Sequence, residues 1–149
     1  MMMSVDDLTA FLAKEYPQLA ESGDFVVDEV APMSAKLRMR YDRRHLRPGG
    51  TISGPSMFTL ADVGLYCAIL GELGPVAMAV TTNLNINFLR MPGQRDLVAV
   101  CRLHKLGKRL AVGEASLVQA GPDGRETLVA HATATYSIPP RSSSGDAVI

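Results

Sequence analysis

The chain has 149 residues, of which 47% are hydrophobic and 5% aromatic, and its 15 basic and 15 acidic side chains give a formal net charge of zero. This length and composition fit one compact domain and exclude a fully disordered chain. Without net charge the overall field does not gather polyphosphate, so we do not expect sequence-independent nucleic-acid binding.

Targeting and metal-binding signals are missing from the sequence. Asp6 and Asp7 stand where a secretory signal would carry basic residues, which predicts a cytoplasmic protein. Glycines, prolines and acids interrupt the weakly charged stretch 48–89, so we expect no membrane-spanning helix there. Cys67 and Cys101 lie in apolar surroundings without metal-ligand spacing, which indicates reduced, buried thiols and no metal site.

The chain begins with a helical segment over residues 1–23. Ser4 followed by two acids is typical of a helix start, and the helix should end before Pro17. Apolar and charged residues then alternate loosely over 24–30 and again over 35–41, which predicts an antiparallel hairpin.

A polar, glycine-rich stretch over 42–53 reads as a loop, and a helix follows it. Ser53 can cap this helix, Pro55 fits its first turn, and Gly71 is a natural stop. Apolar residues cover nearly its whole circumference, so it should be buried on most sides and wrapped by a sheet.

Four strand-like runs complete the pattern: 76–89, 97–104, 109–119 and 127–138. The turns between them are too short for crossover helices, so the sheet should be antiparallel. The sequence therefore predicts an α+β fold, with a curved antiparallel sheet around a long central helix over residues 24–138. Residues 139–149 are expected to form a disordered tail.

Asp62 is the one acid inside this apolar helix. Aspartate is a poor helix former in such a place, and burying an unpaired carboxylate is costly. Asp62 therefore either pairs with an arginine or faces solvent, or it is a poised base or nucleophile.

Gly54 is the second candidate, because its backbone amide at the helix start can donate to a ligand oxygen. Ordinary capping is the alternative. Eight residues separate Gly54 from Asp62, or roughly 12 Å along one helix. A carbonyl group cannot contact both, so a site that uses both groups predicts a homodimer with two antiparallel helices.

Several motifs together resemble the hotdog-fold acyl-CoA thioesterases of the phenylacetate-pathway (PaaI-like) group, within the 4-hydroxybenzoyl-CoA thioesterase superfamily. They are Gly54, Leu60-Ala61-Asp62, the segment 82–90, and the later segments 106–110 and 131–136. The resemblance implies dimers joined edge to edge, often paired as tetramers, with active sites at the dimer interface. It implies an acyl-CoA substrate without a separate cofactor, Asp62 as nucleophile or general base, and the Gly54 amide as donor to the thioester oxygen.

The helix start departs from this family. Ser53-Gly54-Pro55 stands where the family has His-Gly-Gly, and Arg47 stands where it has an asparagine. Ser53 could donate a hydrogen bond in place of the histidine, and Arg47 could bind an oxyanion or a phosphate. Thr81 and Asn83, on an alternating polar strand, are our supporting residues near Asp62, although a solvated face or an interface ladder would also explain them.

Further residues are candidates for substrate binding. Met57, Phe58 and Tyr66 would line an acyl pocket or serve as core. Arg90, Lys108 and Arg109 would pair with the phosphates of coenzyme A or remain solvated.

Three alternatives stay open at this stage. A catalytically weak acyl-CoA-binding protein on the same scaffold would explain the missing histidine and asparagine. A hotdog hydratase would need a histidine acting with an acid, and only His45 could serve. A plain structural dimer would need Asp62 for an ion pair. The sequence leaves open the acyl preference, the choice between dimer and tetramer, and the choice between base and nucleophile.

Overall fold

The computed structural model of the protein describes residues 1–140, so the predicted tail falls almost wholly outside the described residues. Two short helices, α1 (Val5–Glu15) and α2 (Pro17–Ala20), lead the chain. The remaining elements follow in the predicted order: β1 (Phe25–Ala31), β2 (Ser34–Met39), a 3-10 turn (Arg43–His45), α3 (Gly54–Leu73), β3 (Val80–Phe88), β4 (Leu97–Leu106), β5 (Leu110–Ala120) and β6 (Glu126–Ser137).

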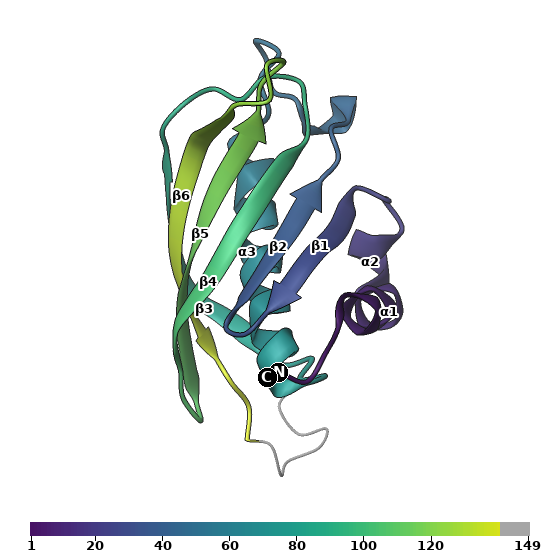
Figure 1. Cartoon of the computed structure of the whole chain (residues 1–149), viewed down its shortest axis with the longest axis vertical. Coiled ribbons are helices and arrows are strands. Elements are labelled where there is room, and N and C mark those ends of the chain that lie inside the picture. Colours follow the sequence, from purple (N-terminus) through teal and green to yellow (C-terminus); the bar gives the residue numbers. More distant parts are fainter. Residues whose placement is uncertain (141–149) are drawn as a thin grey trace.

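The six strands form one sheet in the order β1-β2-β4-β5-β6-β3, and every neighbouring pair is antiparallel. The sheet curves around α3, while α1 and α2 lie beside β1 (Figure 1). This confirms the predicted fold class. Both outer strands, β1 and β3, leave one edge of their backbone without a partner strand within residues 1–140.

Helix α3 begins as predicted, but it does not end at Gly71. Ser53 caps it, with its Oγ accepting from the Ser56 N–H at 3.3 Å, and it continues to Leu73 before Gly74, whose φ is +90°. Gly71 serves packing instead, because a Cβ at that position would lie 2.9 Å from Val30 Cγ1. The positive φ that ends a helix belongs to Gly74.

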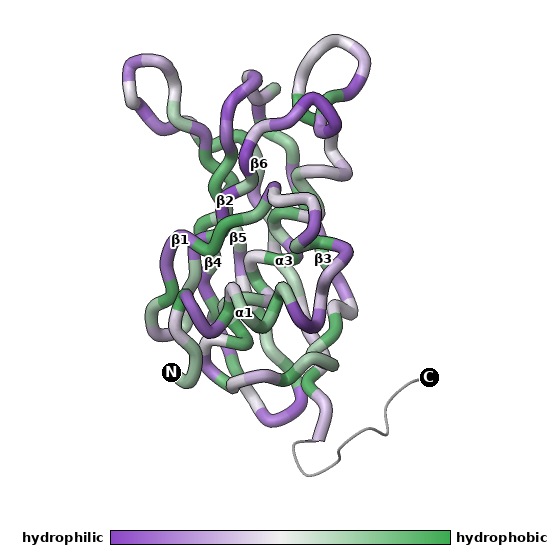
Figure 2. Tube along the Cα trace, turned by 90° about the vertical axis from the view of Figure 1, so that its right-hand side faces the viewer, coloured by the Kyte–Doolittle hydropathy of each residue, from purple (hydrophilic) through white to green (hydrophobic). Residues whose placement is uncertain are grey.

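The middle of α3 is buried against the sheet. At Gly64 a Cβ would lie 2.6 Å from Cys101 Sγ and 3.2 Å from Ala99 Cβ, so helix and strand approach more closely than any side chain would allow. Of the described helices, only α3 is long and apolar enough to cross a membrane, but the sheet buries most of it, which explains its apolarity. Hydrophilic residues gather instead in the loops beyond the strands (Figure 2).

Two segments differ from expectation. The 42–53 loop is packed near both ends, where His45 is 7% exposed and Ile52 is 1% exposed. The polar ring of His45 can be buried because it is hydrogen-bonded to Asp24. The strand expected over 76–89 begins only at Val80. Ahead of it, the Ala79 N–H donates to the Val76 oxygen in a turn, which takes those residues out of the sheet.

Candidate active site

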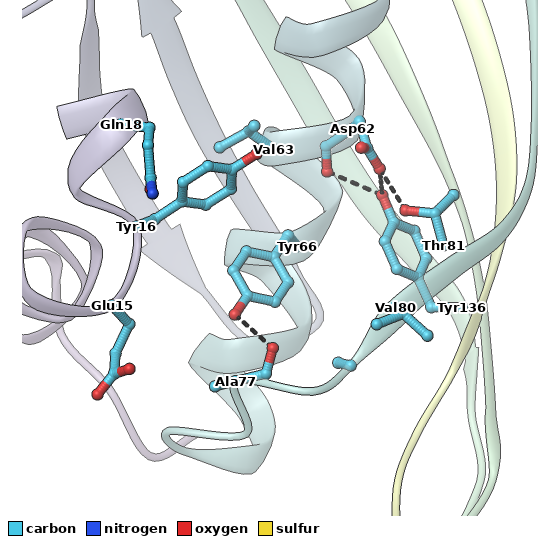
Figure 3. A pocket seen from close by; sticks show the side chains of 11 residues that line it. Glu15, Tyr16, Gln18, Asp62, Val63, Tyr66, Ala77, Val80, Thr81 and Tyr136 are labelled. Carbon is cyan, nitrogen blue, oxygen red and sulfur yellow. Dashed lines mark hydrogen bonds between the residues drawn. The ribbon is translucent and has the colours of Figure 1, made fainter. Parts of the chain in front are cut away.

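Asp62 lies at mid-helix in α3 and is partly buried. Its Oδ1 accepts hydrogen bonds from Thr81 Oγ1 at 2.6 Å and from the Tyr136 hydroxyl at 2.7 Å (Figure 3). Within residues 1–140 no cation pairs with Asp62, so the predicted alternative of an arginine partner is wrong for the described chain. The two hydroxyls fix Oδ1 and leave Oδ2 without a protein donor in the same range, free for water or substrate.

The register of the sheet brings these two hydroxyls together. Thr81 pairs with Tyr136 across β3 and β6, and a bulge before Asn83 shifts the register by one residue. Asn83 therefore pairs with Thr135 and lies on the outer face of the sheet, because successive residues of a strand face opposite sides. Thr81 thus lies beside Asp62 as expected, whereas the expectation that Asn83 shares its face is wrong because of this bulge.

Tyr136 was not among the residues predicted for the site. It is 1% exposed, and its hydroxyl also lies 2.8 Å from the Asp62 backbone oxygen, so one proton is shared between two acceptors of the same residue. Burial, with the Asp62 carboxylate beside it, raises the pKa of Tyr136 well above its ordinary value, which keeps the hydroxyl a donor. The signal in the sequence was one large tyrosine among the inward-facing alanines of its strand.

A pocket of about 480 Å³ opens beside Asp62. Tyr66, Thr81 and Tyr136 line it, together with part of the N-terminal helical segment and with Ala77, Ala79 and Val80 (Figure 3). Tyr66 donates its hydroxyl to the Ala77 backbone oxygen at 3.0 Å, and burial raises its pKa to about 12. The predicted acyl-pocket residue Tyr66 thus shares a cavity with the predicted acid.

Gly54 lies in a different and larger pocket, of about 840 Å³. This pocket also contains three predicted binding residues, Arg47, Met57 and Arg90. Within residues 1–140 the Gly54 backbone N–H has no hydrogen-bond acceptor, and it stands at the positive end of a 20-residue helix. A Cβ there would lie 3.2 Å from the Phe88 ring, so the lack of a side chain keeps the amide approachable.

Ser53 does not stand in for the missing histidine of the family. Its Oγ accepts from the Ser56 N–H and donates to Ser56 Oγ at 3.0 Å, so both its roles are used within the helix cap. Phe58, 40% exposed, lines neither pocket.

A buried polar cluster holds the loop that precedes Gly54. His45 Nε2 lies 3.0 Å from Asp24 Oδ2, and its Nδ1 accepts from the Asp42 N–H, which makes Nε2 the donor. Burial favours the neutral form of Asp24, but hydrogen bonds from Arg44 and His45 outweigh it and lower the pKa of Asp24. The His45 carbonyl accepts from the Ser53 N–H at 2.8 Å, so the cluster positions the start of α3.

The remaining predicted basic residues lie elsewhere. Lys108 and Arg109 line a third cavity of about 570 Å³ at the turn between β4 and β5, where Arg109 also donates to the Ile138 oxygen. Cys67 and Cys101 are free and buried, and burial raises the pKa of Cys67 to about 12. Within residues 1–140 no group of three or more His, Cys, Asp or Glu side chains is arranged to hold a metal ion.

The two halves of the predicted site therefore do not meet in one chain. The pocket of Asp62 and the pocket of Gly54 have no residue in common. Eight helical steps from Gly54 to Asp62 already required a separation of roughly 12 Å. A single chain thus holds one carboxylate half and one amide half, each in its own pocket.

Comparison with known proteins bears on the family of the chain. Residues 49–126 match the model of the family described as "Thioesterase superfamily". The chain is 32% identical over 139 residues to a Pseudomonas aeruginosa protein named "Putative esterase PA0474", covering 93% of this chain and all of that protein.

Two crystal structures extend the likeness. A "putative thioesterase" from Silicibacter sp. TM1040 is 47% identical, with a TM-score of 0.81 and 93% of each chain covered. A Ralstonia eutropha JMP134 structure described as a "putative thioesterase, phenylacetic acid degradation-related protein" is 27% identical, with a TM-score of 0.73, covering 82% of this chain and 90% of its own. This chain therefore belongs to the thioesterase superfamily, as a thioester hydrolase of the hotdog fold and the PaaI-like type.

Proposed function

We propose that the protein hydrolyses acyl-CoA thioesters at a site formed by two protomers, with Asp62 from one and the Gly54 amide from the other. The observation that carries this proposal is the arrangement around Asp62. Two hydroxyls hold one carboxylate oxygen, and the other oxygen is unpaired within residues 1–140 and lines a pocket. Such an arrangement orients a base or nucleophile without neutralising it.

In this proposal the thioester oxygen accepts a hydrogen bond from the Gly54 N–H, and the helix dipole stabilises the negative charge that develops on it. Asp62 Oδ2 takes a proton from a water molecule, whose oxygen attacks the carbonyl carbon. The carbon–sulfur bond then breaks, the proton held by Asp62 passes to the leaving thiolate, and the products are a free acid and coenzyme A. Direct attack by Asp62 would give an acyl-enzyme anhydride that water hydrolyses, and both routes need the same geometry.

In this proposal the second protomer pairs along β3. This strand is an edge of the sheet, and exposed edges readily pair with another chain. Large apolar side chains are exposed along it and just beyond: Val80, Phe88, Leu89 and Met91. Pairing there would cover the apolar residues and bring the Gly54 pocket of one copy toward Asp62 of the other. Assembly into a tetramer stays a prediction, as does the cytoplasmic location.

Coenzyme A would contact the amide half. Arg47 and Arg90 line the Gly54 pocket, where their guanidinium groups could pair with its phosphates. Lys108 and Arg109 line a separate cavity in the single chain, and they would contribute only if the assembly places that cavity near the substrate.

One alternative retains a specific observation in its favour. Ser53 is engaged in the helix cap, so nothing at that position replaces the family's histidine, and a weakly catalytic acyl-CoA-binding protein would tolerate that loss. A hydratase is less well supported, because both ring nitrogens of His45 are engaged and His45 lines neither pocket.

The test is thiol release from short, long and aromatic acyl-CoAs by the parent protein and by Asp62→Asn at equal folded concentration. We expect Asp62→Asn to lower kcat/KM by about 10²–10⁴-fold. Asp6→Asn, which removes an exposed helical carboxylate that lines neither pocket, is the matched control and should retain full activity. Binding of acyl-CoA without turnover of any substrate would establish the binding protein instead.

A further inference from the structure

The N-terminal helical segment forms one wall of the Asp62 pocket. Glu15, Tyr16 and Gln18 line the cavity from the side of α1 and α2, facing α3 across it (Figure 3). The match to the family begins only at residue 49, so this wall lies outside the matched region. A residue that determines which acyl group this chain accepts would be expected in a region that the family model does not match.

The wall is fixed in place. Leu8, Leu12 and Leu19 are buried in the core, and the backbone N–H groups of Met2 and Met3 both donate to the Gly71 oxygen at the end of α3. The junction of the two helices is also hydrogen-bonded, since the Tyr16 N–H donates to the Leu12 oxygen. The side chains that line the pocket thus project from an anchored backbone.

The free hydrogen-bonding groups of the pocket belong mainly to this wall. The hydroxyls of Tyr66, Thr81 and Tyr136 are all used in bonds within the protein. Glu15, Tyr16 and Gln18 are exposed, and their side chains have no hydrogen-bond or ion-pair partner among residues 1–140. Apart from Asp62 Oδ2, which the proposed reaction uses, a substrate group that needs a hydrogen-bond partner there would therefore find it on the N-terminal wall.

The charge of the pocket is one-sided. Glu15 and Asp62 are carboxyl residues, and no lysine, arginine or histidine among residues 1–140 lines the cavity. An acyl group that carries its own carboxylate would be repelled by Glu15 and Asp62, and no cation of the cavity lining would offset that repulsion. A hydroxyl brings no such repulsion and can both donate and accept.

We propose that the N-terminal wall selects uncharged acyl groups that carry a hydroxyl at the far end, and that Glu15 is the residue that rejects acyl groups ending in a carboxylate. This inference rests on the proposed function, because it takes the Asp62 pocket as the acyl site. Tyr16 and Gln18 supply the hydrogen-bonding partners for the hydroxyl.

Three thioesters of equal chain length test it: pentanoyl-CoA, 5-hydroxypentanoyl-CoA and glutaryl-CoA, which differ only at the fifth carbon. For the parent protein we expect kcat/KM for the hydroxylated substrate to exceed that for glutaryl-CoA at least fivefold. Glu15→Gln should raise glutaryl-CoA turnover several-fold and leave pentanoyl-CoA unchanged. Glu21→Gln removes an exposed carboxylate of the same segment outside the pocket, and it should change none of the three rates.

Tyr16→Phe should lower the preference for the hydroxylated substrate over pentanoyl-CoA, because it removes the hydroxyl and keeps the ring. Equal rates for all three substrates, with no effect of Glu15→Gln on glutaryl-CoA, would overturn the role of the wall while the thioesterase activity stands.

A protein that releases no thiol from any acyl-CoA would contradict the proposed function, and binding then decides the role of the wall. The Kd of each thioester is measured by titration calorimetry with Asp62→Asn and with Asp62→Asn/Glu15→Gln. Tighter glutaryl-CoA binding only when Glu15 is replaced supports the wall, and identical values contradict it.

Discussion

The two candidate groups of α3, Asp62 at mid-helix and Gly54 at the helix start, have different surroundings. At mid-helix, Asp62 is held by the side chains of two strands, and residues of the same chain line its pocket. At the helix start, the Gly54 amide is unpaired within residues 1–140, and exposed Phe88, Leu89 and Met91 surround it. The carboxylate half is organised by folding, whereas the amide half has the exposed apolar surface of an incomplete site. In the proposed two-protomer site, assembly rather than folding alone would complete the catalytic geometry.

The largest effect expected at the amide half comes from Gly54→Ala. Its Cβ would lie 3.2 Å from the Phe88 ring and beside the amide, so it should block the approach of the thioester oxygen. We expect kcat/KM to fall by about 10²-fold, comparable to the loss of an oxyanion donor. Thiol-release kinetics beside a thermal melt check this, and unchanged activity would show that no substrate approaches Gly54.

A smaller effect is expected from removing one support of the carboxylate. Tyr136→Phe deletes the hydroxyl that bonds Asp62 and leaves the buried ring, so it should lower kcat about tenfold and the free energy of unfolding by about 1 kcal/mol. Thr81→Val should have a weaker effect on stability, because Thr81 is exposed. Urea denaturation and kcat are measured together. A loss of stability with unchanged kcat would assign Tyr136 to the core alone.

The buried cluster of Asp24, Arg44 and His45, which holds the loop before Gly54, gives a pH-dependent prediction. The pKa of Asp24 is lowered from its ordinary 3.8, so its ionised form stabilises the fold above that pH, and this contribution is lost as the pH falls through the folded pKa. Asp24→Asn should therefore lower the free energy of unfolding by about 1–3 kcal/mol at pH 7. The difference from the parent protein should shrink between pH 5 and pH 3. Urea midpoints across this range test it, and a constant difference would contradict the sign.

The smallest effect concerns substrate affinity. Arg47→Ala and Arg90→Ala should each raise KM for acyl-CoA by about three- to tenfold and leave kcat nearly unchanged, because phosphate contacts are made equally before and during the reaction. Lys108→Ala serves as the comparison from the third cavity. A rise of KM in Lys108→Ala, with none in Arg47→Ala or Arg90→Ala, would place the nucleotide at that cavity rather than beside Gly54.

The element order and the fold class could be predicted from the sequence, because periodicity and capping are local signals. The joint use of Asp62 and Gly54 in one site stays a prediction. The bulge in β3 could not, since it depends on the register with β6 rather than on alternation. For this reason Asn83 was expected near Asp62 and Tyr136 was missed. The end of α3 was placed at Gly71 because a glycine suits both a close contact with Val30 and a helix end, and only packing distinguishes them.

The most direct test of a site shared by two chains is complementation between two inactive variants, Asp62→Asn and Gly54→Ala, unfolded and refolded together in equal amounts. Random pairing makes half of the dimers mixed, and each mixed dimer has one site with both groups intact, so about one quarter of the parent activity should return. A mixture no more active than the two variants measured separately would contradict the account, because it would mean that Asp62 and Gly54 act within the same chain.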